Sequence, residues 1–499
     1  MAAGTGFRTV RENGGRMECR CDLNILSSFA RTLRNAGSRL QNGGHRIAKR
    51  SLAWPERSDG KSVPAMVFVT MWFIDPGTPD QLGPTTAEGA VWFRDAVKAG
   101  DVSDPFLFSG WENRGAYFIN GGEAPMTFAL EVDEKGTGNW KKLRDVKLGA
   151  NESMWQVFTD AEVGEWIRVK AARDCAAATV HFAYVAKERR EANPDAIFDG
   201  LAKIGDAKSV AALMRPRGEN KRTLAVAAIN VENGAAADAG YYEMDGDAKL
   251  AKVEDQPARD FTVKTVEIPK NSLTIDDASV VITDGKNRRW RLPKGDPKFD
   301  SASQNGLLRI EREVSTERDL FDCCGTFYEV PADNSGGFAK LRPVASHNFA
   351  IMEYCSYRGL LVLSGIAATD SKNPHIVKSD DGKTALWCGA FDDLWKLGKP
   401  VGRGGPWKNS ATKAGTPSDP YLMGSYDKRT LSLSHDAQES VTFTIELDPA
   451  GMETWVSYKT ITVAPGKTAS HEFPAALSAR WIRITASAGC RADAHLTYE

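Results

Sequence analysis

No run of roughly eighteen apolar residues occurs in the sequence, so a membrane-spanning helix is not predicted. Histidine and cysteine are scarce, with 7 and 8 residues among 499, and the cysteines follow neither a zinc spacing nor a regular disulfide framework. A glycine-rich phosphate loop, a nucleophile elbow and an HExxH motif are also missing. We therefore expect neither a bound metal nor a cofactor.

The net charge is close to zero, because 64 Lys and Arg residues balance 65 Asp and Glu residues. This balance gives no electrostatic reason to expect nucleic acid as a partner. The charges are unevenly placed, since residues 1–57 hold eleven basic and four acidic residues. This basic leader is either a disordered, non-native extension or a targeting segment whose residues 23–40 form an amphipathic helix. No signal peptide is evident, because the first apolar run, residues 65–74, lies too far into the chain.

The most informative feature is an internal repeat with a shift of 315 residues. Residues 72–175 match residues 387–490 without a gap, and roughly a quarter of the positions are identical. A Ser-Asp-Pro motif occurs at 103–105 and again at 418–420. Four tryptophans also coincide, in the pairs Trp72/Trp387, Trp92/Trp407, Trp140/Trp455 and Trp166/Trp481. The sequence predicts two copies of one module.

Apolar and polar residues alternate in each copy, which indicates half-buried strands. The apolar positions are Met126, Phe128, Leu130 and Val132 in the first copy and Val441, Phe443, Ile445 and Leu447 in the second. Turns rich in Asp and Gly separate short strands of this kind, so each copy is expected to be an antiparallel β-sandwich of about 110 residues. The order of strands and tryptophans resembles galactose-binding-like jelly rolls that serve as carbohydrate-binding modules.

The pattern changes between the copies, over residues 186–385. A short helix is predicted at Pro194–Ile204, with Asn193 as its N-cap. Asp-Gly pairs at 245–246 and 284–285 predict tight hairpin turns. The segment Ser379–Thr384 is similar to the Asp-box turn of sialidase-type β-propellers. We interpret this middle region as propeller-like, with a length sufficient for about four blades.

The length of the repeat shift suggests that the repeating unit is one such middle plus one sandwich. Residues 186–499 then form a whole unit, whereas the first copy has only its sandwich, and we expect its N-terminal part to be missing. The sequences of residues 322–331 (DCCGTFYEVP) and 355–363 (CSYRGLLVL) also resemble long, uncharacterised bacterial proteins that combine a propeller with a jelly roll. This resemblance implies an extracellular or periplasmic location and brings no established activity. The cysteines leave a reducing compartment open as well.

The predicted fold is therefore all-β, with two homologous antiparallel, jelly-roll-like β-sandwich modules flanking a β-propeller-like, hairpin-rich middle. The expected boundaries are 1–57 for the leader, 58–185 for the first sandwich, 186–385 for the middle and 386–499 for the second sandwich.

Paired carboxylates are the first candidates for catalytic residues, because glycoside hydrolysis needs an acid together with a base or nucleophile. A second group with histidine and arginine would suit a lyase acting on uronic acids. Alternatively, the Asp392-Asp393 pair caps backbone amides at a turn, and the histidine is a structural residue. The candidates are Asp322, Glu329, His347, Arg342 and Asp392.

Aromatic residues are the candidates for ligand binding, because sugar rings stack on them. Trp111 and Tyr426 occupy equivalent places in the two copies, while Trp395 and Tyr357 lie near the candidate catalytic groups. Edge packing is the alternative role for the first pair. A metal site at Cys323-Cys324 is not expected, because vicinal residues face opposite sides of a strand. The Ser-Asp-Pro motif is a shared turn or, alternatively, a calcium ligand.

These features favour a carbohydrate-binding or glycan-associated interaction protein whose partner is a poly- or oligosaccharide. The alternative is a polysaccharide-degrading enzyme, a glycoside hydrolase or a lyase, with its site on the propeller-like middle.

Overall fold

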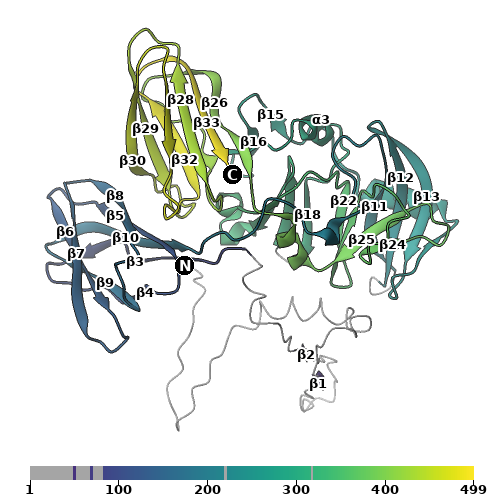
Figure 1. The fold of residues 1–499 in the computed structure, drawn as a ribbon, viewed down its shortest axis with the longest axis horizontal. Helices are drawn as coiled ribbons and strands as arrows, with labels where there is room; N and C mark the ends of the chain where they lie inside the picture. The colour runs from purple at the N-terminus through teal and green to yellow at the C-terminus, as the bar shows by residue number, and fades with distance from the viewer. Residues whose placement is uncertain (1–48, 52–67, 71–82, 219–221, 316–317) are drawn as a thin grey trace.

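Antiparallel β-sheets make up most of the protein in the computed structural model (Figure 1), which describes residues 49–51, 68–70, 83–218, 222–315 and 318–499. The all-β prediction is confirmed. Nearly all of the basic leader lies outside the described residues. The part of it that the structure describes is β1 (Lys49–Ser51), which pairs with β2 (Phe68–Thr70). Among the helices of the described residues, none is long and apolar enough to cross a membrane.

The first part of the structure is a pair of four-stranded sheets with one core between them. The strand orders are β3-β10-β5-β8 and β4-β9-β6-β7. Phe118 and Val180 of one sheet and Phe128 and Ile167 of the other belong to the same buried cluster. The strands are β3 (Thr86–Val97), β4 (Phe106–Leu107), β5 (Asn113–Asn120), β6 (Met126–Asp133), β7 (Trp140–Leu148), β8 (Ser153–Phe158), β9 (Trp166–Ala171) and β10 (Cys175–Val185).

The C-terminal part contains a second pair of sheets in which the equivalent strands follow the same order. These orders are β26-β33-β28-β31 and β27-β32-β29-β30. The alternation expected for residues 441–447 is observed, since Val441, Phe443, Ile445 and Leu447 are all buried. The strands are β26 (Gly402–Thr412), β27 (Tyr421–Leu422), β28 (Arg429–His435), β29 (Val441–Asp448), β30 (Val456–Val463), β31 (Thr468–Glu472), β32 (Trp481–Ala486) and β33 (Cys490–Tyr498).

Side-chain contacts on the outer faces of the two sheet pairs also correspond. Arg168 lies over the ring of Trp140 at 4.2 Å and pairs with Glu131 at 2.7 Å. In the C-terminal pair, Arg483 lies over the ring of Trp455 at 4.4 Å and pairs with Glu446 at 2.8 Å. A guanidinium group held between an aromatic face and a carboxylate is a favourable arrangement, and it occurs at the same place in both pairs.

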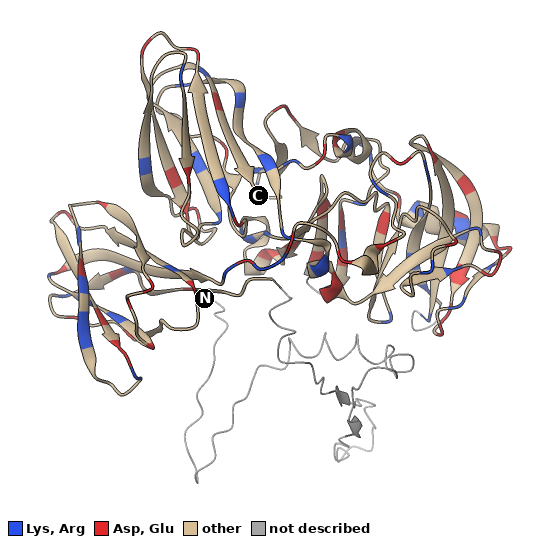
Figure 2. Ribbon diagram, viewed as in Figure 1, with Lys and Arg blue, Asp and Glu red and all other residues tan. Residues whose placement is uncertain are grey.

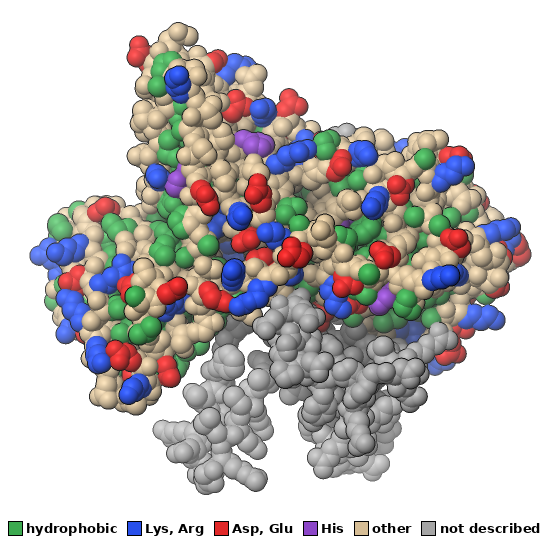
Figure 3. Space-filling view, in the orientation of Figure 1, with side chains coloured by type: hydrophobic (Ala, Val, Ile, Leu, Met, Phe, Trp, Pro, Cys, Tyr) green, Lys and Arg blue, Asp and Glu red, His purple; other side chains and the backbone are tan. Residues whose placement is uncertain are grey.

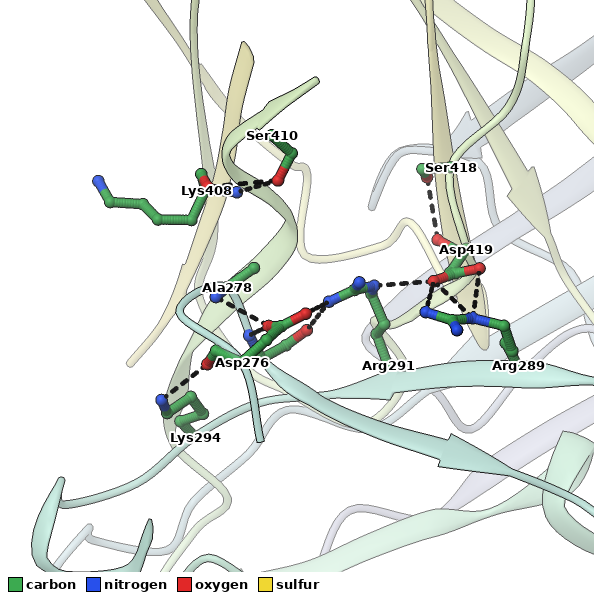
Figure 4. Close-up of polar contacts among 10 residues, drawn as sticks. Asp276, Ala278, Arg289, Arg291, Lys294, Lys408, Ser410, Ser418 and Asp419 are labelled. Atoms are coloured by element: carbon green, nitrogen blue, oxygen red, sulfur yellow. Dashed lines mark hydrogen bonds and ion pairs between the residues drawn. The ribbon is translucent and has the colours of Figure 1, made fainter. Parts of the chain in front are cut away.

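The hairpin expected at 280–292 lies in a different sheet from the one anticipated. Its strands β15 (Thr274–Ile275), β16 (Val280–Thr283) and β17 (Arg289–Leu292) extend the second sheet of the C-terminal pair to seven strands. β17 runs parallel to β27, with Arg291 opposite Tyr421. Figure 4 shows why this junction forms, because Arg289 and Arg291 both bond the carboxylate of Asp419.

The middle of the chain forms three further four-stranded sheets. Met214 and Tyr242 of the first pack against Val362 and Leu386 of the third, and the third packs through Trp387 onto the second. The first holds β11 (Lys208–Arg217), β12 (Thr223–Glu232), β13 (Ala235–Met244) and β14 (Leu250–Lys252); the second holds β18 (Glu311–Ser315), β19 (Arg318–Cys323), β20 (Thr326–Pro331) and β21 (Arg342–Ser346); the third holds β22 (Glu353–Tyr357), β23 (Leu360–Ser364), β24 (Ile376–Lys378) and β25 (Ala385–Gly389).

The helix predicted at 194–204 is wrong. Only a single 3₁₀ turn forms, η2 (Ala196–Phe198), and Asp195 rather than Asn193 caps it. Gly200 then takes φ +99°, and Leu201 pairs with Ile366 as a β-bridge. Tertiary pairing therefore overrides the helical pattern. The longer helices are α2 (Gln256–Thr265) and α3 (Lys298–Gln304), and the other 3₁₀ segments are η4 (Asp333–Ser335), η5 (Gly337–Lys340) and η6 (Phe391–Leu397).

Aspartates hold the turns that the sequence indicated. The carboxylates of Asp245 and Asp284 each accept backbone N–H groups two and four residues ahead. In the Asp-box-like segment, Asp381 accepts from Ser379 Oγ and from the hydroxyl of Tyr242, which joins this turn to β13. Lys/Arg and Asp/Glu residues are both spread along the described strands and turns in Figure 2.

Replacing Asp284 with asparagine is expected to lower the free energy of unfolding by about 1 to 3 kcal/mol at pH 7. Burial opposes ionisation of Asp284, but hydrogen bonds from Trp290 Nε1 and from Arg288 outweigh it and lower the pKa to about 2. The stabilisation from the ionised form is complete above the unfolded-state pKa near 4 and disappears as the pH falls towards about 2.

Denaturant titrations at pH 7 and at pH 2 measure this difference. Asp245→Asn is the matched control, because among the described residues that carboxylate accepts hydrogen bonds from backbone N–H groups only. An equal loss of stability in both variants, or a loss that persists at pH 2, would contradict the assignment.

Candidate functional site

Asp322 and His347 lie together, but inside the protein. Their side chains are 6% and 0% exposed, and Nε2 of His347 is 3.3 Å from Oδ1 of Asp322, outside hydrogen-bonding geometry. The backbone N–H of Phe349 donates to Nδ1 of His347, which assigns the ring proton to Nε2. The rings of Phe299, Phe327 and Phe349 surround the imidazole. This pair therefore lies in an aromatic core rather than at the surface, and its action on a substrate stays a prediction.

Glu329 and Arg342 form an ion pair with Nη2 and Oε2 3.3 Å apart. The guanidinium group of Arg342 also lies over the ring of Trp395 at 4.8 Å. Arg190, from the segment after β10, lies over the same ring at 5.0 Å and pairs with Glu188 at 2.7 Å. Trp395 is thus packed between charged groups that join three parts of the chain, rather than presented to a sugar.

Asp322 and Glu329 face the same side of their sheet as diagonal neighbours, because Glu329 is opposite Leu320 in the strand register. That spacing would suit two glycosidase carboxylates. The aromatic ring of Phe327 lies on the same face and is fully buried. Asp322 lies on the buried part of this face, whereas the side chain of Glu329 is partly exposed.

Asp392 lies in the first turn of η6 beside Asp393. The carboxylate of Asp393 accepts the backbone N–H of Ala390 and pairs with Lys396 at 2.9 Å. Asp393 therefore behaves as the alternative predicted for this pair, capping a turn.

The other predicted ligand-binding aromatics pack into cores. Tyr357 is 3% exposed, and its hydroxyl donates to the carbonyl of Met244. Tyr426 is 4% exposed and stacks on Tyr498 with ring centroids 4.2 Å apart. Trp111 is half-buried and contacts Tyr184 at 5.6 Å. Tyr357 and Tyr426 are therefore buried rather than presented at the surface, and a binding role for them stays a prediction.

The cysteines of the described residues are free thiols, and four of them are buried. Burial raises the pKa of the Cys355 thiol to about 12, so it is protonated and unreactive at neutral pH. No group of three or more His, Cys, Asp or Glu side chains within the described ranges is arranged to hold a metal ion. Asp419, the candidate calcium ligand, is instead paired with arginines.

A cavity of about 490 Å³ lies where the middle sheets meet the C-terminal sheet pair. Such a volume is typical of small-molecule sites. Its walls come from the segment before η2, the loop between β17 and α3, the end of β21 and the adjoining ends of β26 and β33. The polar residues that line it are Asn193, Lys294, Asp296, Ser346, His347, Asn348, Arg403, Thr497 and Tyr498.

Among the five candidate catalytic residues, His347 alone lines this cavity, and it does so through its main chain because its side chain is 0% exposed. Asp296 is the carboxylate present, and it caps the backbone N–H of Lys298. Lys294 is neutralised by Asp300, at 2.7 Å. Within the described part of the chain, the cavity therefore lacks the two carboxylates that hydrolysis requires.

Arg403 is the cationic group of the cavity. It is exposed, and no carboxylate of the described residues forms an ion pair with it. Asn193 and Asn348 are exposed beside the same cavity and supply amide donors and acceptors. Arg403 was not among the residues predicted. The signal available in the sequence was a difference between the two copies, because the residue that aligns with Arg403 in the first copy is Glu88.

Figure 3 shows one face of the molecule, on which acidic and basic side chains are interspersed.

No family model matches the chain, and no curated protein matches it. Solved structures that resemble it include the PBSX exported protein XepA, with 7% identity over 86% of this chain and 89% of its own and a TM-score of 0.16. The CBM22-1–CBM22-2 tandem domain from Paenibacillus barcinonensis Xyn10C has 8% identity over 83% of this chain and 99% of its own, with a TM-score of 0.13. These scores are too low to relate this chain to either protein in fold or function.

Proposed function

We propose that the protein binds glycans without cleaving them, and that the cavity beside Arg403 takes a saccharide unit bearing a carboxylate. In this proposal, residues 58–185 and 386–499 are repeated β-sandwich modules, and residues 186–385 are a propeller-related middle. The shared strand order of the two sheet pairs supports the first assignment, and the three four-stranded sheets packed in a row support the second.

The exposed guanidinium group of Arg403 is the observation that carries the proposal. A planar guanidinium binds a carboxylate through two parallel hydrogen bonds, which distinguishes an acidic sugar from a neutral one. The amides of Asn193 and Asn348 can pair with sugar hydroxyls, since each amide both donates and accepts. The lack of a carboxylate pair in the described lining favours binding over hydrolysis.

The Arg403→Ala variant is expected to bind acidic polysaccharides at least about tenfold more weakly than the parent chain. Calorimetric titration with polygalacturonate, alginate and hyaluronan measures the change, with xylan and galactan as neutral comparisons. Lys408→Ala is the matched control, because Lys408 lies on the same strand, is exposed and does not line the cavity.

Two results would overturn the proposal. One is that the parent chain binds none of these polysaccharides, and the other is that Arg403→Ala and Lys408→Ala bind acidic chains equally well. Release of reducing sugar or unsaturated uronate by the parent chain would instead support the enzymatic alternative.

A further inference from the structure

An apolar surface is exposed on the outer face of the first sheet pair. Leu107 of β4 is opposite Trp166 of β9 in the strand register, and their side chains are 40% and 38% exposed. Val163, which leads into β9, is 60% exposed. β4 is also the edge strand of its sheet, so its outer backbone groups can accept another strand.

The equivalent surface of the C-terminal sheet pair is fully covered. Leu422 is opposite Trp481 in the same register, and both are 0% exposed. The ring of Trp290 from β17 lies 4.4 Å from that of Trp481, and Trp481 Nε1 donates to the carbonyl of Ala339. Identical or closely similar residues are thus buried in one pair by the added hairpin and left exposed in the other.

The backbone at this edge shows how the hairpin is held. The N–H of Arg291 in β17 donates to the carbonyl of Pro420, 2.8 Å away, immediately before β27. Pro105 stands at the same point before β4. Among the described residues, none donates a hydrogen bond to the Pro105 carbonyl, which is the matching acceptor for a strand that adds in the same direction.

The acidic residues at the two sheet edges also differ in whether they are paired. In the C-terminal pair, Asp419 bonds Arg289 Nη2 and Arg291 Nε, each at 3.1 Å (Figure 4). Asp104 occupies the same turn, since Ser103 Oγ and Ser418 Oγ make the same 2.9 Å bond to the next carbonyl. Asp104 is exposed, and no basic side chain in the described ranges forms an ion pair with it.

A second acid strengthens the negative charge of this surface. Glu165, directly before Trp166, is exposed. The residue at its place in the C-terminal pair is Arg480, which donates to the carbonyl of Lys340 in the covering segment. An occupant of the first surface therefore meets two acidic groups beside three apolar ones, which favours a basic and aromatic strand.

We propose that the surface formed by Asp104, Leu107, Val163, Glu165 and Trp166 binds a β-hairpin of a separate polypeptide. The incoming strand carries arginine on both sides of an aromatic residue, as in Arg289-Trp290-Arg291, and adds parallel to β4. A second copy of this chain does not supply it, because its own hairpin is already paired with β27 and Trp290 is 1% exposed. This inference rests on the equivalence of the two sheet pairs and is independent of the glycan cavity.

A synthetic peptide of residues 274–294, labelled with fluorescein, tests the inference against the full-length chain by fluorescence anisotropy. We expect saturable binding that weakens about tenfold in Asp104→Asn and is lost in Leu107→Lys. A peptide carrying Arg289→Glu and Arg291→Glu should not bind. Phe261→Ser is the matched control, because Phe261 is 56% exposed on α2 and lies outside the proposed surface.

A photo-crosslinking residue at position 107 provides a second measurement, with attachment expected at peptide residues 289–291. Absence of saturable binding overturns the inference. Binding that is weakened by Asp419→Asn but not by Asp104→Asn also overturns it, because the peptide would then be displacing the internal hairpin. Either failure would leave polysaccharide binding in the parent chain unaffected, so the two proposals are tested separately.

Discussion

Replacing Glu353 with glutamine is expected to lower the free energy of unfolding by about 3 to 5 kcal/mol. The Glu353 side chain is 0% exposed and is held by two arginines. Arg309 bonds both carboxylate oxygens, at 2.9 and 2.5 Å, and Arg312 bonds one at 2.9 Å. Loss of the negative charge leaves two buried guanidinium groups without a counter-ion, and that penalty is much larger than the loss of a surface pair.

The effect should extend beyond the carboxylate. Arg309 also donates to the carbonyls of Val266 and Glu267, which follow α2, so the charge cluster connects β18, β22 and the end of that helix. In Glu353→Gln we therefore expect faster hydrogen exchange of the amides in α2 as well as a lower denaturation midpoint.

Glu446→Gln is the matched control, because Glu446 pairs with Arg483 where both side chains are partly exposed. Its cost should be about 1 kcal/mol or less. Urea titration of the two variants, followed by circular dichroism, measures the contrast. Similar midpoints for both variants would show that the buried cluster is not the source of the stability assigned to it.

The Trp481→Ala variant should lose about 3 to 5 kcal/mol of stability, whereas Trp166→Ala should lose about 1 kcal/mol. The two tryptophans occupy the same place in the two copies, but Trp481 is 0% exposed and Trp166 is 38% exposed. Truncating Trp481 opens a cavity against Trp290 and removes the hydrogen bond to Ala339. Truncating Trp166 removes a side chain that water already reaches.

Differential scanning calorimetry of both variants measures this contrast within one chain. Each substitution removes the same atoms, so the difference reports the environment alone. Equal destabilisation would mean that the hairpin β15–β17 does not contribute to the stability of the C-terminal sheet pair.

Local features of the chain were predictable from the sequence. Alternating residues such as Met126, Phe128 and Leu130 form a strand because every second side chain must enter a core, and this period can be read without a partner. Asp284-Gly285 forms its turn because the carboxylate bonds nearby backbone groups. The all-β class and the positions of many strands and turns follow from interactions of this short range.

Most of the candidate site could not be predicted, because it depends on contacts between residues that are far apart in the sequence. Asp322 and His347 carry reactive groups, but Phe299 of α3 closes over the imidazole of His347 from a segment that is remote in the sequence. A tyrosine in the sequence is compatible with a surface position or a core position. The sequence therefore could not show that Tyr357 and Tyr426 are buried. Arg403 lines a cavity only because the ends of β26 and β33 meet the middle sheets.

The sequence by itself determined the strands, the turns and the repeat, because each depends on residues close together or on direct comparison of the two copies. Only the tertiary structure decided which surfaces of the copies are covered. Leu107 with Trp166 and Leu422 with Trp481 are the same pair of residue types, yet one pair is exposed and the other is buried. The cause is a hairpin that lies more than a hundred residues before β27 and joins one copy alone, through the arginines that Asp419 binds.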